Sequence, residues 1–326
     1  MKALITGVQG FVGKYLADHL LSQGIEVWGT SREESPLLHL THGNVKIIKN
    51  DLNSEEEILN LLQNSKPDYI FHLAGQSNVK KSWEDKAGTF YANVNKTIFL
   101  LDACVRYQKE NPNMRLLTVG SSEEYGKVEP HELPIKETTP LRPMSPYGAS
   151  KAAVSMLIQQ YHKAHGLNVV HVRPFNHIGP GQAEGFVVPD FSNQIVRIET
   201  GQIEPVIRVG NLSAARDFID VRDIVDIYTK LMILKRSDEL FGSVINVCSG
   251  ESRGIREILD ILVENSEACI TIEIDESKLR PIDMPIYFGE RSILDRYLPN
   301  LDYIKVEETL RDTLKSTRRL KENESD

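Results

Sequence analysis

The segment KALITGVQGFVGKYLADHLLSQG, residues 2–24, contains an apolar run, a glycine-rich turn and an amphipathic stretch in immediate succession. KALIT is typical of a buried strand, and FVGKYLADHLLSQ has the apolar spacing of a helix that ends before Gly24. Gly7, Gly10 and Gly13 occupy the turn, where glycine lets the backbone bend sharply and approach a pyrophosphate at the helix N-terminus. A plain glycine turn is the alternative, but this order of elements favours a dinucleotide site.

The alternation of short apolar runs and helical periods continues through the first half of the chain. IEVWGTS, VKIIKND, DYIFHLA, MRLLTVGSS and NVVHVRPFN are typical of strands, and SEEEILNLLQNS, GTFYANVNKTIFLLDACVRYQ and YGASKAAVSMLIQQYHKAH of helices. This pattern predicts an α/β fold, a Rossmann-type doubly wound parallel sheet. After about residue 173 loops rich in glycine and proline predominate and indicate a smaller substrate-binding α/β lobe, from which SVINVCSG returns to the sheet.

These changes of pattern predict three parts of the chain. The expected parts are a dinucleotide-binding domain in residues 1–172 and 215–250, a smaller substrate-binding lobe in 173–214 and 251–316, and a polar tail, 317–326, that frays.

Composition and charge limit the classes of partner. The net charge of -8 argues against a nucleic-acid partner, although helix ends and single arginines can still bind an anionic nucleotide. No apolar run reaches the length of a membrane span, and the first residues lack the pattern of a secretion signal. We therefore expect a cytoplasmic protein that does not bind membranes.

The cysteines and histidines predict neither disulfides nor a metal site. Cys104, Cys248 and Cys269 are widely spaced, and each is expected to be a core residue in a reducing compartment. His162 and His165 could share a helix face, but the histidines show no close metal-ligand spacing.

The residues after the second predicted strand bear on the choice of cofactor. Thr30, Ser31 and Arg32 stand where an acidic residue would bind the ribose hydroxyls. Hydroxyls and a guanidinium suit a 2′-phosphate, so NADP(H) is favoured. Arg32 as a solvated loop residue beside Glu33 and Glu34 is the alternative, which keeps NAD(H) possible. Further predicted cofactor contacts are Phe11 and Val12 after the turn, Asp51 and Leu52 beside the adenine, and Leu73, Ala74 and Gly75 at the ribose side.

The stretch MSPYGASK places Tyr147 and Lys151 four residues apart on one face of a predicted helix. An ammonium near a phenol favours the phenolate and is expected to lower the pKa from about 10 toward neutrality. Such a phenol can exchange a proton with a substrate oxygen as hydride moves to or from the adjoining carbon. A serine of GSSEEYG, residues 120–126, could orient the same oxygen.

These motifs together resemble the extended short-chain dehydrogenase/reductases. More narrowly, GSSEEYG, LRPMSPYGASK, RPFNHIGPGQ, RDFIDVRDIV and NVCSG are similar to the GDP-6-deoxy-4-keto-D-mannose reductases, which make GDP-D-rhamnose, and the resemblance covers nearly the whole chain. It implies Ser121, Tyr147 and Lys151 as the catalytic set, with Ser122 as the neighbouring alternative to Ser121. It also implies that Asn93 supports the active site.

The resemblance implies a GDP-linked 4-keto-6-deoxy sugar as the substrate. Asn176 follows a strand directly and suits a diphosphate or a sugar hydroxyl, whereas His177 is either a site residue or a packed loop residue. Arg216 and Arg280 could bind a diphosphate together, or each could pair with the aspartate near it. Ser122, Glu123 and Val209 complete the predicted substrate contacts.

The reaction itself has competing interpretations. The first is reduction of the 4-keto group, with Tyr147 as the proton donor. The second is the related GDP-mannose 4,6-dehydratase reaction, which needs a base two residues after the hydroxyl residue, and Glu123 stands there. Those dehydratases carry an arginine pair shortly after their Asn-His, where this chain has IGPGQAEG, so reduction is preferred. An epimerase and a non-catalytic dinucleotide-binding regulator are further alternatives, and the intact catalytic set argues against the regulator.

Two long predicted helices, at about residues 88–108 and 147–165, resemble those that pair into a four-helix interface in this superfamily. The resemblance therefore implies a homodimer.

Overall fold

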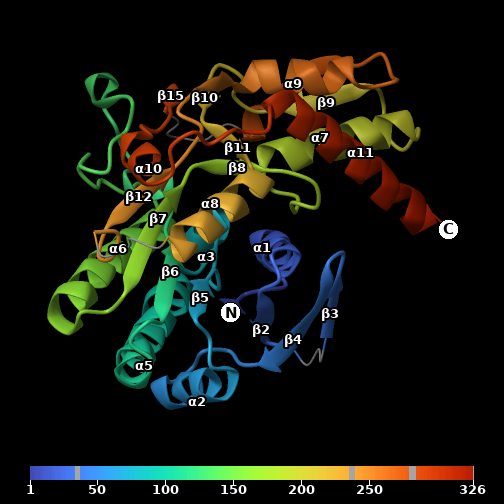
Figure 1. Cartoon of the computed structure of the whole chain (residues 1–326). Helices are drawn as coiled ribbons and strands as arrows, with labels where there is room; N and C mark the ends of the chain where they lie inside the picture. The colour runs from blue at the N-terminus through green and yellow to red at the C-terminus, as the bar shows by residue number, and fades with distance from the viewer. Residues whose placement is uncertain (34–36, 235–238, 279–283, 326) are drawn as a thin grey trace.

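The computed structural model describes residues 1–33, 37–234, 239–278 and 284–325. An eight-stranded sheet in the order β12-β7-β6-β5-β1-β2-β4-β3 forms its centre (Figure 1). Every pairing in it is parallel except that of β3 with β4, which confirms the predicted Rossmann-type doubly wound sheet. The strands are β1 (Lys2–Thr6), β2 (Glu26–Ser31), β3 (Leu37–Leu40), β4 (Gly43–Lys49), β5 (Tyr69–His72), β6 (Arg115–Val119), β7 (Val169–Pro174) and β12 (Val244–Val247).

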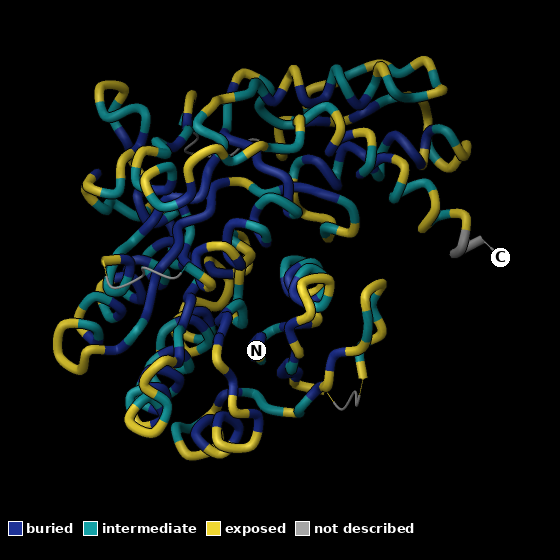
Figure 2. The backbone as a smooth tube through the Cα atoms, viewed as in Figure 1, coloured by how far each residue is buried: buried dark blue, intermediate teal, exposed yellow. Residues whose placement is uncertain are grey.

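Helices cover both faces of this sheet because successive strand side chains point to opposite sides. Ile5 packs with α1 (Phe11–Ser22) and α8 (Val221–Ile233), whereas its neighbour Leu4 packs with α2 (Glu55–Ser65), α5 (Lys96–Glu110) and α6 (Pro146–His165). The central strands are buried along their length (Figure 2). Two apolar cores thus hold the strand ends in fixed positions relative to the helices.

The helix expected over residues 88–108 is interrupted in the structure. A short helix α4 (Lys86–Phe90) leads into a π-helical turn, Tyr91–Asn95, before α5 begins. Such turns re-aim a side chain, and Asn93 within this one is buried against Gln76 and Ser150. The interruption therefore lies at Asn93, the residue predicted to support the active site.

A smaller lobe with its own apolar core lies above the carboxyl ends of the central strands (Figure 1). Its elements are β8 (Asn176–Ile178), α7 (Val187–Glu199), β9 (Val206–Val209), β10 (Ala215–Arg216), β11 (Phe218–Asp220), β13 (Arg253–Gly254), α9 (Ile255–Glu264), β14 (Thr271–Ile274), β15 (Ile286–Tyr287) and α11 (Val306–Ser325). Helix α10 (Ser292–Tyr297) packs back against the main sheet. The chain after residue 316 continues α11 as far as Ser325, and Leu310 and Leu314 anchor this helix in the lobe.

The cysteines agree only in part with the prediction that each is a core residue. Cys104 and Cys248 are buried, but Cys269 is exposed because it lies in the segment before β14 at the rim of the lobe, so its prediction as a core residue is wrong.

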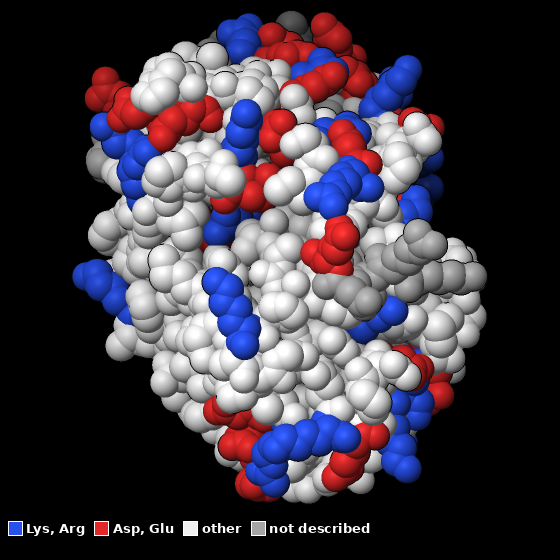
Figure 3. Space-filling view, turned by 60° about the vertical axis from the view of Figure 1, so that its left-hand side comes forward, with Lys and Arg blue, Asp and Glu red and all other residues white. Residues whose placement is uncertain are grey.

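The surface shown in Figure 3 carries acidic and basic side chains side by side toward both ends, and its middle is largely uncharged. Among the described residues, no helix has the length and apolar character needed to cross a bilayer.

Candidate active site

The glycine turn between β1 and α1 has the geometry that a pyrophosphate requires. Gly7 has a φ of 72°, a conformation that L side chains rarely adopt, and its carbonyl oxygen accepts from Gly10 N–H over 3.0 Å. A Cβ on Gly13 would lie 2.5 Å from the oxygen of Gly7. Gly10 caps α1 without a side chain, so the first N–H groups of the helix face the turn and suit an anion. Phe11 and Val12 open this helix, as predicted.

The predicted adenosine end lies where β2 and β4 finish side by side. Ser31 and Lys49 are register partners there, and Ser31 Oγ donates to Gln9 Oε1 over 2.7 Å. Asp51 pairs with Lys96 over 2.7 Å. The side chain of Leu52 is buried in the core below α2, so its predicted contact with a cofactor is limited to the backbone. A pocket of about 460 Å³ opens here, lined by Arg32, Lys49, Asn50, Asp51, Asn53, Glu57 and Asn60.

Gly75, predicted to line the ribose of the cofactor, lies close to Asn93 and Lys151. A Cβ on Gly75 would lie 2.8 Å from Asn93 Oδ1 and 3.8 Å from Lys151 Nζ. Asn93 Nδ2 donates to Ser150 Oγ over 2.9 Å, which joins the π-helical turn to α6. Leu73 and Ala74 precede Gly75 after β5, and Ala74 N–H donates to Thr6 Oγ1.

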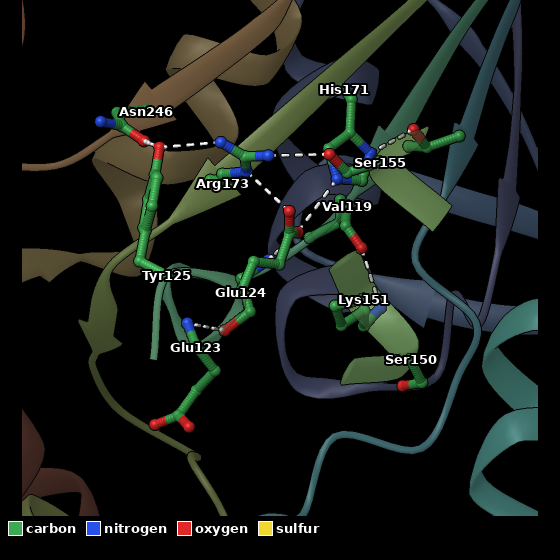
Figure 4. A network of polar contacts seen from close by, with 12 residues as sticks. Val119, Glu123, Glu124, Tyr125, Ser150, Lys151, Ser155, His171, Arg173 and Asn246 are labelled. Atoms are coloured by element: carbon green, nitrogen blue, oxygen red, sulfur yellow. Dashed lines mark hydrogen bonds and ion pairs between the residues drawn. The ribbon is translucent and has the colours of Figure 1, made fainter. Parts of the chain in front are cut away.

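The three predicted catalytic residues converge at the end of β6. Tyr147 is only 8% exposed, and its phenol lies close enough to the Ser121 hydroxyl for that group to lower its pKa. Lys151 Nζ lies 5.9 Å from the centroid of the Tyr147 ring and donates to the carbonyl oxygen of Val119 over 2.8 Å (Figure 4). Ser145 caps α6 and Pro146 opens it, so the tyrosine and lysine occupy the first two turns of one helix.

The protonation of this set differs from the prediction made for the tyrosine. Burial raises the pKa of the Tyr147 phenol, and the nearby charges of Glu123 and Glu124 raise it further, while the nearby Ser121 hydroxyl lowers it. Burial also lowers the pKa of Lys151 to about 8. The expected lowering of the phenol pKa is therefore wrong for this state, because the cost of burying a phenolate exceeds the lowering by the Ser121 hydroxyl. The Tyr147 phenol is therefore neutral in this structure.

The GSSEEYG segment separates into different roles. Ser121 begins a single 3₁₀ turn, Ser122–Glu124, and its Oγ accepts from Glu123 N–H over 3.1 Å. The Ser122 side chain is buried, and its carbonyl oxygen accepts from Tyr287 Oη over 2.7 Å. Ser121 is thus the serine that pairs with Tyr147. The carboxylate of Glu123 points away from the polar network in Figure 4.

A buried network beneath Ser121 was missed from the sequence. Glu124, fully buried, accepts from Arg173 Nε over 2.6 Å and lies 3.1 Å from His171 Nε2 (Figure 4). Tyr125 is also fully buried, and its hydroxyl donates to Asn246 Oδ1 over 2.6 Å. The available signal was the occurrence of polar residues in strands that are otherwise apolar.

The predicted substrate residues lie on both sides of the lobe boundary. Asn176 is exposed at the start of β8, where its Nδ2 donates to the carbonyl oxygen of Asp217 over 3.1 Å. His177 stacks on Phe11 of the glycine turn, with ring centroids 6.1 Å apart, which favours its interpretation as a packed residue. Arg216 donates to two carbonyl oxygens, those of Ala215 and Met284.

Val209 and Arg280, the other predicted substrate residues, do not present a described side chain to the site. The Val209 side chain is buried in the core of the lobe, so only its backbone is available to a ligand. Arg280 and the neighbouring Asp283 lie outside the described residues. Asp217, considered as a partner of Arg216, is buried and accepts from the N–H groups of Ser249, Gly250 and Gly289. Within the described parts of the chain, no group of three or more His, Cys, Asp or Glu side chains could hold a metal ion.

Known proteins are similar to this chain over most of its length. A family model described as GDP-mannose 4,6 dehydratase matches residues 4–313. The chain is 34% identical to GDP-6-deoxy-D-mannose reductase of Pseudomonas aeruginosa over 279 residues, which cover 86% of this chain and 84% of that protein. It is equally 34% identical to human GDP-mannose 4,6 dehydratase over 271 residues, covering 79% and 70% of the two chains.

Solved structures share the whole architecture. The structure of RMD from Pseudomonas aeruginosa complexed with NADPH superposes with a TM-score of 0.82 at 29% identity, over 98% of this chain and 99% of that chain. The UDP-N-acetylglucosamine 4-epimerase from Methanobrevibacter ruminantium M1 gives a TM-score of 0.82 at 28% identity, over 98% of each chain. The similarity thus extends over both lobes.

Proposed function

The chain belongs to the GDP-mannose 4,6-dehydratase family, and from this premise we propose that it is an NAD(P)H-dependent reductase of the 4-keto group of GDP-4-keto-6-deoxy-D-mannose, giving GDP-D-rhamnose. The observation that carries the proposal is the Tyr147 phenol, which is buried and neutral and lies beside the Ser121 hydroxyl and the Lys151 ammonium. A proton donor beside an orienting hydroxyl is what ketone reduction requires. In this proposal residues 1–172 and 221–250 bind the cofactor, and residues 173–220 and 251–316 bind the sugar nucleotide. The predicted boundary at residue 215 is moved because β10 and β11 pair with strands of the smaller lobe.

The residues present fit a nicotinamide dinucleotide, which when bound supplies the hydride that adds to C4. Tyr147 gives its proton to the oxygen of the same carbon, so the ketone becomes an alcohol. Ser121 Oγ already accepts from Glu123 N–H, which leaves its own proton available to hold the substrate oxygen in line. The ammonium of Lys151 stabilises the phenolate that the proton transfer leaves behind.

The cofactor is proposed to be NADPH in preference to NADH. Arg32 and Lys49 lie at adjacent strand ends and line the same pocket. Two cations there suit a 2′-phosphate, which guanidinium groups bind with paired hydrogen bonds. The similar Pseudomonas structure contains NADPH.

The GDP-mannose 4,6-dehydratase reaction is the second candidate because of one observation. Glu123 lies two residues after Ser121 and is close enough to Tyr147 to raise the pKa of its phenol. A carboxylate there is suitably placed to accept a proton from the sugar ring. The same Glu-containing motif was noted above in the similar reductases, so the residue is compatible with either reaction.

One assay separates the two reactions. The purified protein is incubated with GDP-4-keto-6-deoxy-D-mannose and an excess of NADPH, and in a parallel sample with GDP-mannose. Loss of reduced nicotinamide in proportion to sugar nucleotide consumed supports the reductase. Conversion of GDP-mannose without net loss of reduced cofactor would establish the dehydratase instead. The Tyr147→Phe variant serves as the control for background oxidation of NADPH.

We also propose that the protein is a homodimer that pairs through α5 and α6. The turned view brings this side of the molecule forward, and its middle carries few charged side chains (Figure 3). Phe90, Tyr91 and Met156 are exposed on or next to these helices, and exposed apolar groups that gather on one side are typical of an interface. Analytical ultracentrifugation of the wild type and of Met156→Glu tests the proposal, because only the variant should sediment as a monomer.

A further inference from the structure

Glu124 is a carboxylate without contact to solvent and the last residue of the 3₁₀ turn that Ser121 begins. Its Oε1 accepts from the Ser121 backbone N–H over 3.0 Å, and its Oε2 accepts from Arg173 Nε over 2.6 Å. His171 Nε2 lies 3.1 Å from Oε1. Each carboxylate oxygen therefore has a fixed donor, and Ser121 is attached to one of them.

The backbone around Glu124 leaves just enough space for the carboxylate. A Cβ on Gly120 would lie 2.1 Å from Glu124 Oε1 and 2.3 Å from His171 Nε2. The end of β6 is therefore shaped around the carboxylate, and a side chain at position 120 would displace it. Ser121 Oγ in turn accepts from Glu123 N–H. The same turn therefore restrains both the backbone N–H and the hydroxyl of Ser121.

Arg173 connects this carboxylate to other strand ends. Its Nη1 donates to the Tyr125 hydroxyl over 3.0 Å, and its Nη2 donates to Ser155 Oγ of α6 over 2.8 Å. The Tyr125 hydroxyl in turn donates to Asn246 of β12. The serine is thus positioned relative to β6, β7, β12 and the helix that carries Tyr147.

Resting on the proposed function, we propose that Glu124 is a positioning residue, which holds the Ser121 hydroxyl in line with Tyr147 through its bond to the Ser121 N–H and its anchorage on Arg173. It does not itself reach the substrate oxygen. Displacing a reacting group by about 1 Å can cost about 100-fold in rate, so the effect of losing Glu124 should fall on kcat.

The test is a double-mutant cycle between positions 124 and 121. Glu124→Leu should lower kcat for ketone reduction by about 100-fold and change the KM for the sugar nucleotide by less than about threefold. In a Ser121→Ala background the same substitution should lower kcat by less than about threefold, because the group that it positions is already absent. Equal losses in both backgrounds, or an unchanged kcat in Glu124→Leu, would overturn the proposal.

Two further variants separate positioning from folding. Glu124→Gln keeps an oxygen that can accept from Ser121 N–H and should recover part of the lost kcat. Glu132→Gln is the matched control, because Glu132 occupies the same position of another capped 3₁₀ turn and pairs with Arg142. Its kcat should stay within about twofold of the wild type. NADPH binding, measured by nicotinamide fluorescence, confirms that each variant is folded.

A measurement that does not depend on catalysis tests the positioning role separately from the proposed function. Hydrogen exchange at the Ser121 amide should be faster in Glu124→Leu than in the wild type and unchanged in Glu132→Gln. If the wild type fails to reduce the keto sugar but this difference appears, the proposed function fails and the positioning of Ser121 stands. Unchanged exchange at Ser121 in Glu124→Leu would contradict the positioning role whatever reaction the protein catalyses.

Discussion

The ammonium of Lys151 is held by the carbonyl oxygen of Val119, 2.8 Å away, at the end of the strand that leads to Ser121. The contact joins the second turn of α6 to the end of β6 and fixes the positive charge 5.9 Å from the centroid of the Tyr147 ring. Burial meanwhile raises the pKa of the phenol and lowers that of the amine. The pair is therefore arranged with the proton on the tyrosine, the state from which the proposed ketone reduction starts.

Replacing Tyr147 with phenylalanine should remove the proton donor and leave the cofactor site intact. General acid catalysis contributes about 10²–10⁴-fold, so we expect kcat for ketone reduction to fall by about 1000-fold. NADPH affinity, measured by fluorescence titration, should change by less than about threefold. Turnover near that of the wild type would show that another group delivers the proton.

Replacing Lys151 with methionine should stabilise the cofactor-free protein at neutral pH while abolishing activity. Burial lowers the pKa of this amine from 10.5 to about 8, so folding near pH 7 includes the cost of burying a charge. Because the amine is only partly buried and donates to Val119, we expect a gain of about 1 kcal/mol, well below what the full shift would give.

The pH dependence of that gain follows from the sign of the shift. Below about pH 8 the lysine is charged in both the folded and the unfolded chain, so the cost is complete. As the pH rises from about 8 to 10.5, the folded form loses its proton first and the cost disappears. Calorimetry at pH 7 and at about pH 10 should therefore show the Tm advantage shrinking with pH. Lys163→Met, at an exposed position of the same helix, is the control and should show no such trend.

Replacing Arg32 with alanine should weaken the use of NADPH selectively. The loss of a guanidinium–phosphate contact should raise the KM for NADPH by about tenfold, while the KM for NADH, which lacks the phosphate, should hardly change. Arg311→Ala, exposed on α11, is the control. An equal rise for both coenzymes would mean that Arg32 contacts a part of the cofactor that both share.

The sheet was predictable because its strands are local apolar runs. Seven of its strands correspond to predicted segments, from KALIT to SVINVCSG. The eighth, Leu37–Leu40, was missed because its side chains alternate only between exposed and half-buried, and it pairs antiparallel at the edge. Tertiary pairing with β4, which a local pattern does not encode, determines its conformation.

The candidate site was predictable only in its sequence-local part. Tyr147 and Lys151 share a helix face, and the glycines share a turn, so spacing alone indicates them. The carboxylate of Glu124 meets His171 and Arg173 from positions 47 and 49 residues away. Contacts over such separations depend on the order of strands in the sheet, and the direction of the Tyr147 pKa shift depends on burial that only the folded chain defines.

Replacing Glu123 with glutamine should leave the kcat for ketone reduction within about threefold of that of the wild type. The contacts of this residue with Ser121 and α6 are made by its backbone atoms. Its N–H donates to Ser121 Oγ, and its carbonyl oxygen would lie 2.4 Å from a Cβ on Gly148, so the turn packs closely on α6 through main-chain atoms. The amide keeps the size of the side chain but accepts a proton poorly, so any GDP-mannose dehydration by the wild type should fall by about 1000-fold, as expected for loss of an acid–base group. Steady-state assays with both sugar nucleotides measure the two effects in one preparation. A variant that no longer reduces the keto sugar, yet binds NADPH normally, would identify Glu123 as a working acid–base group and contradict the assignment of proton transfer to Tyr147 alone.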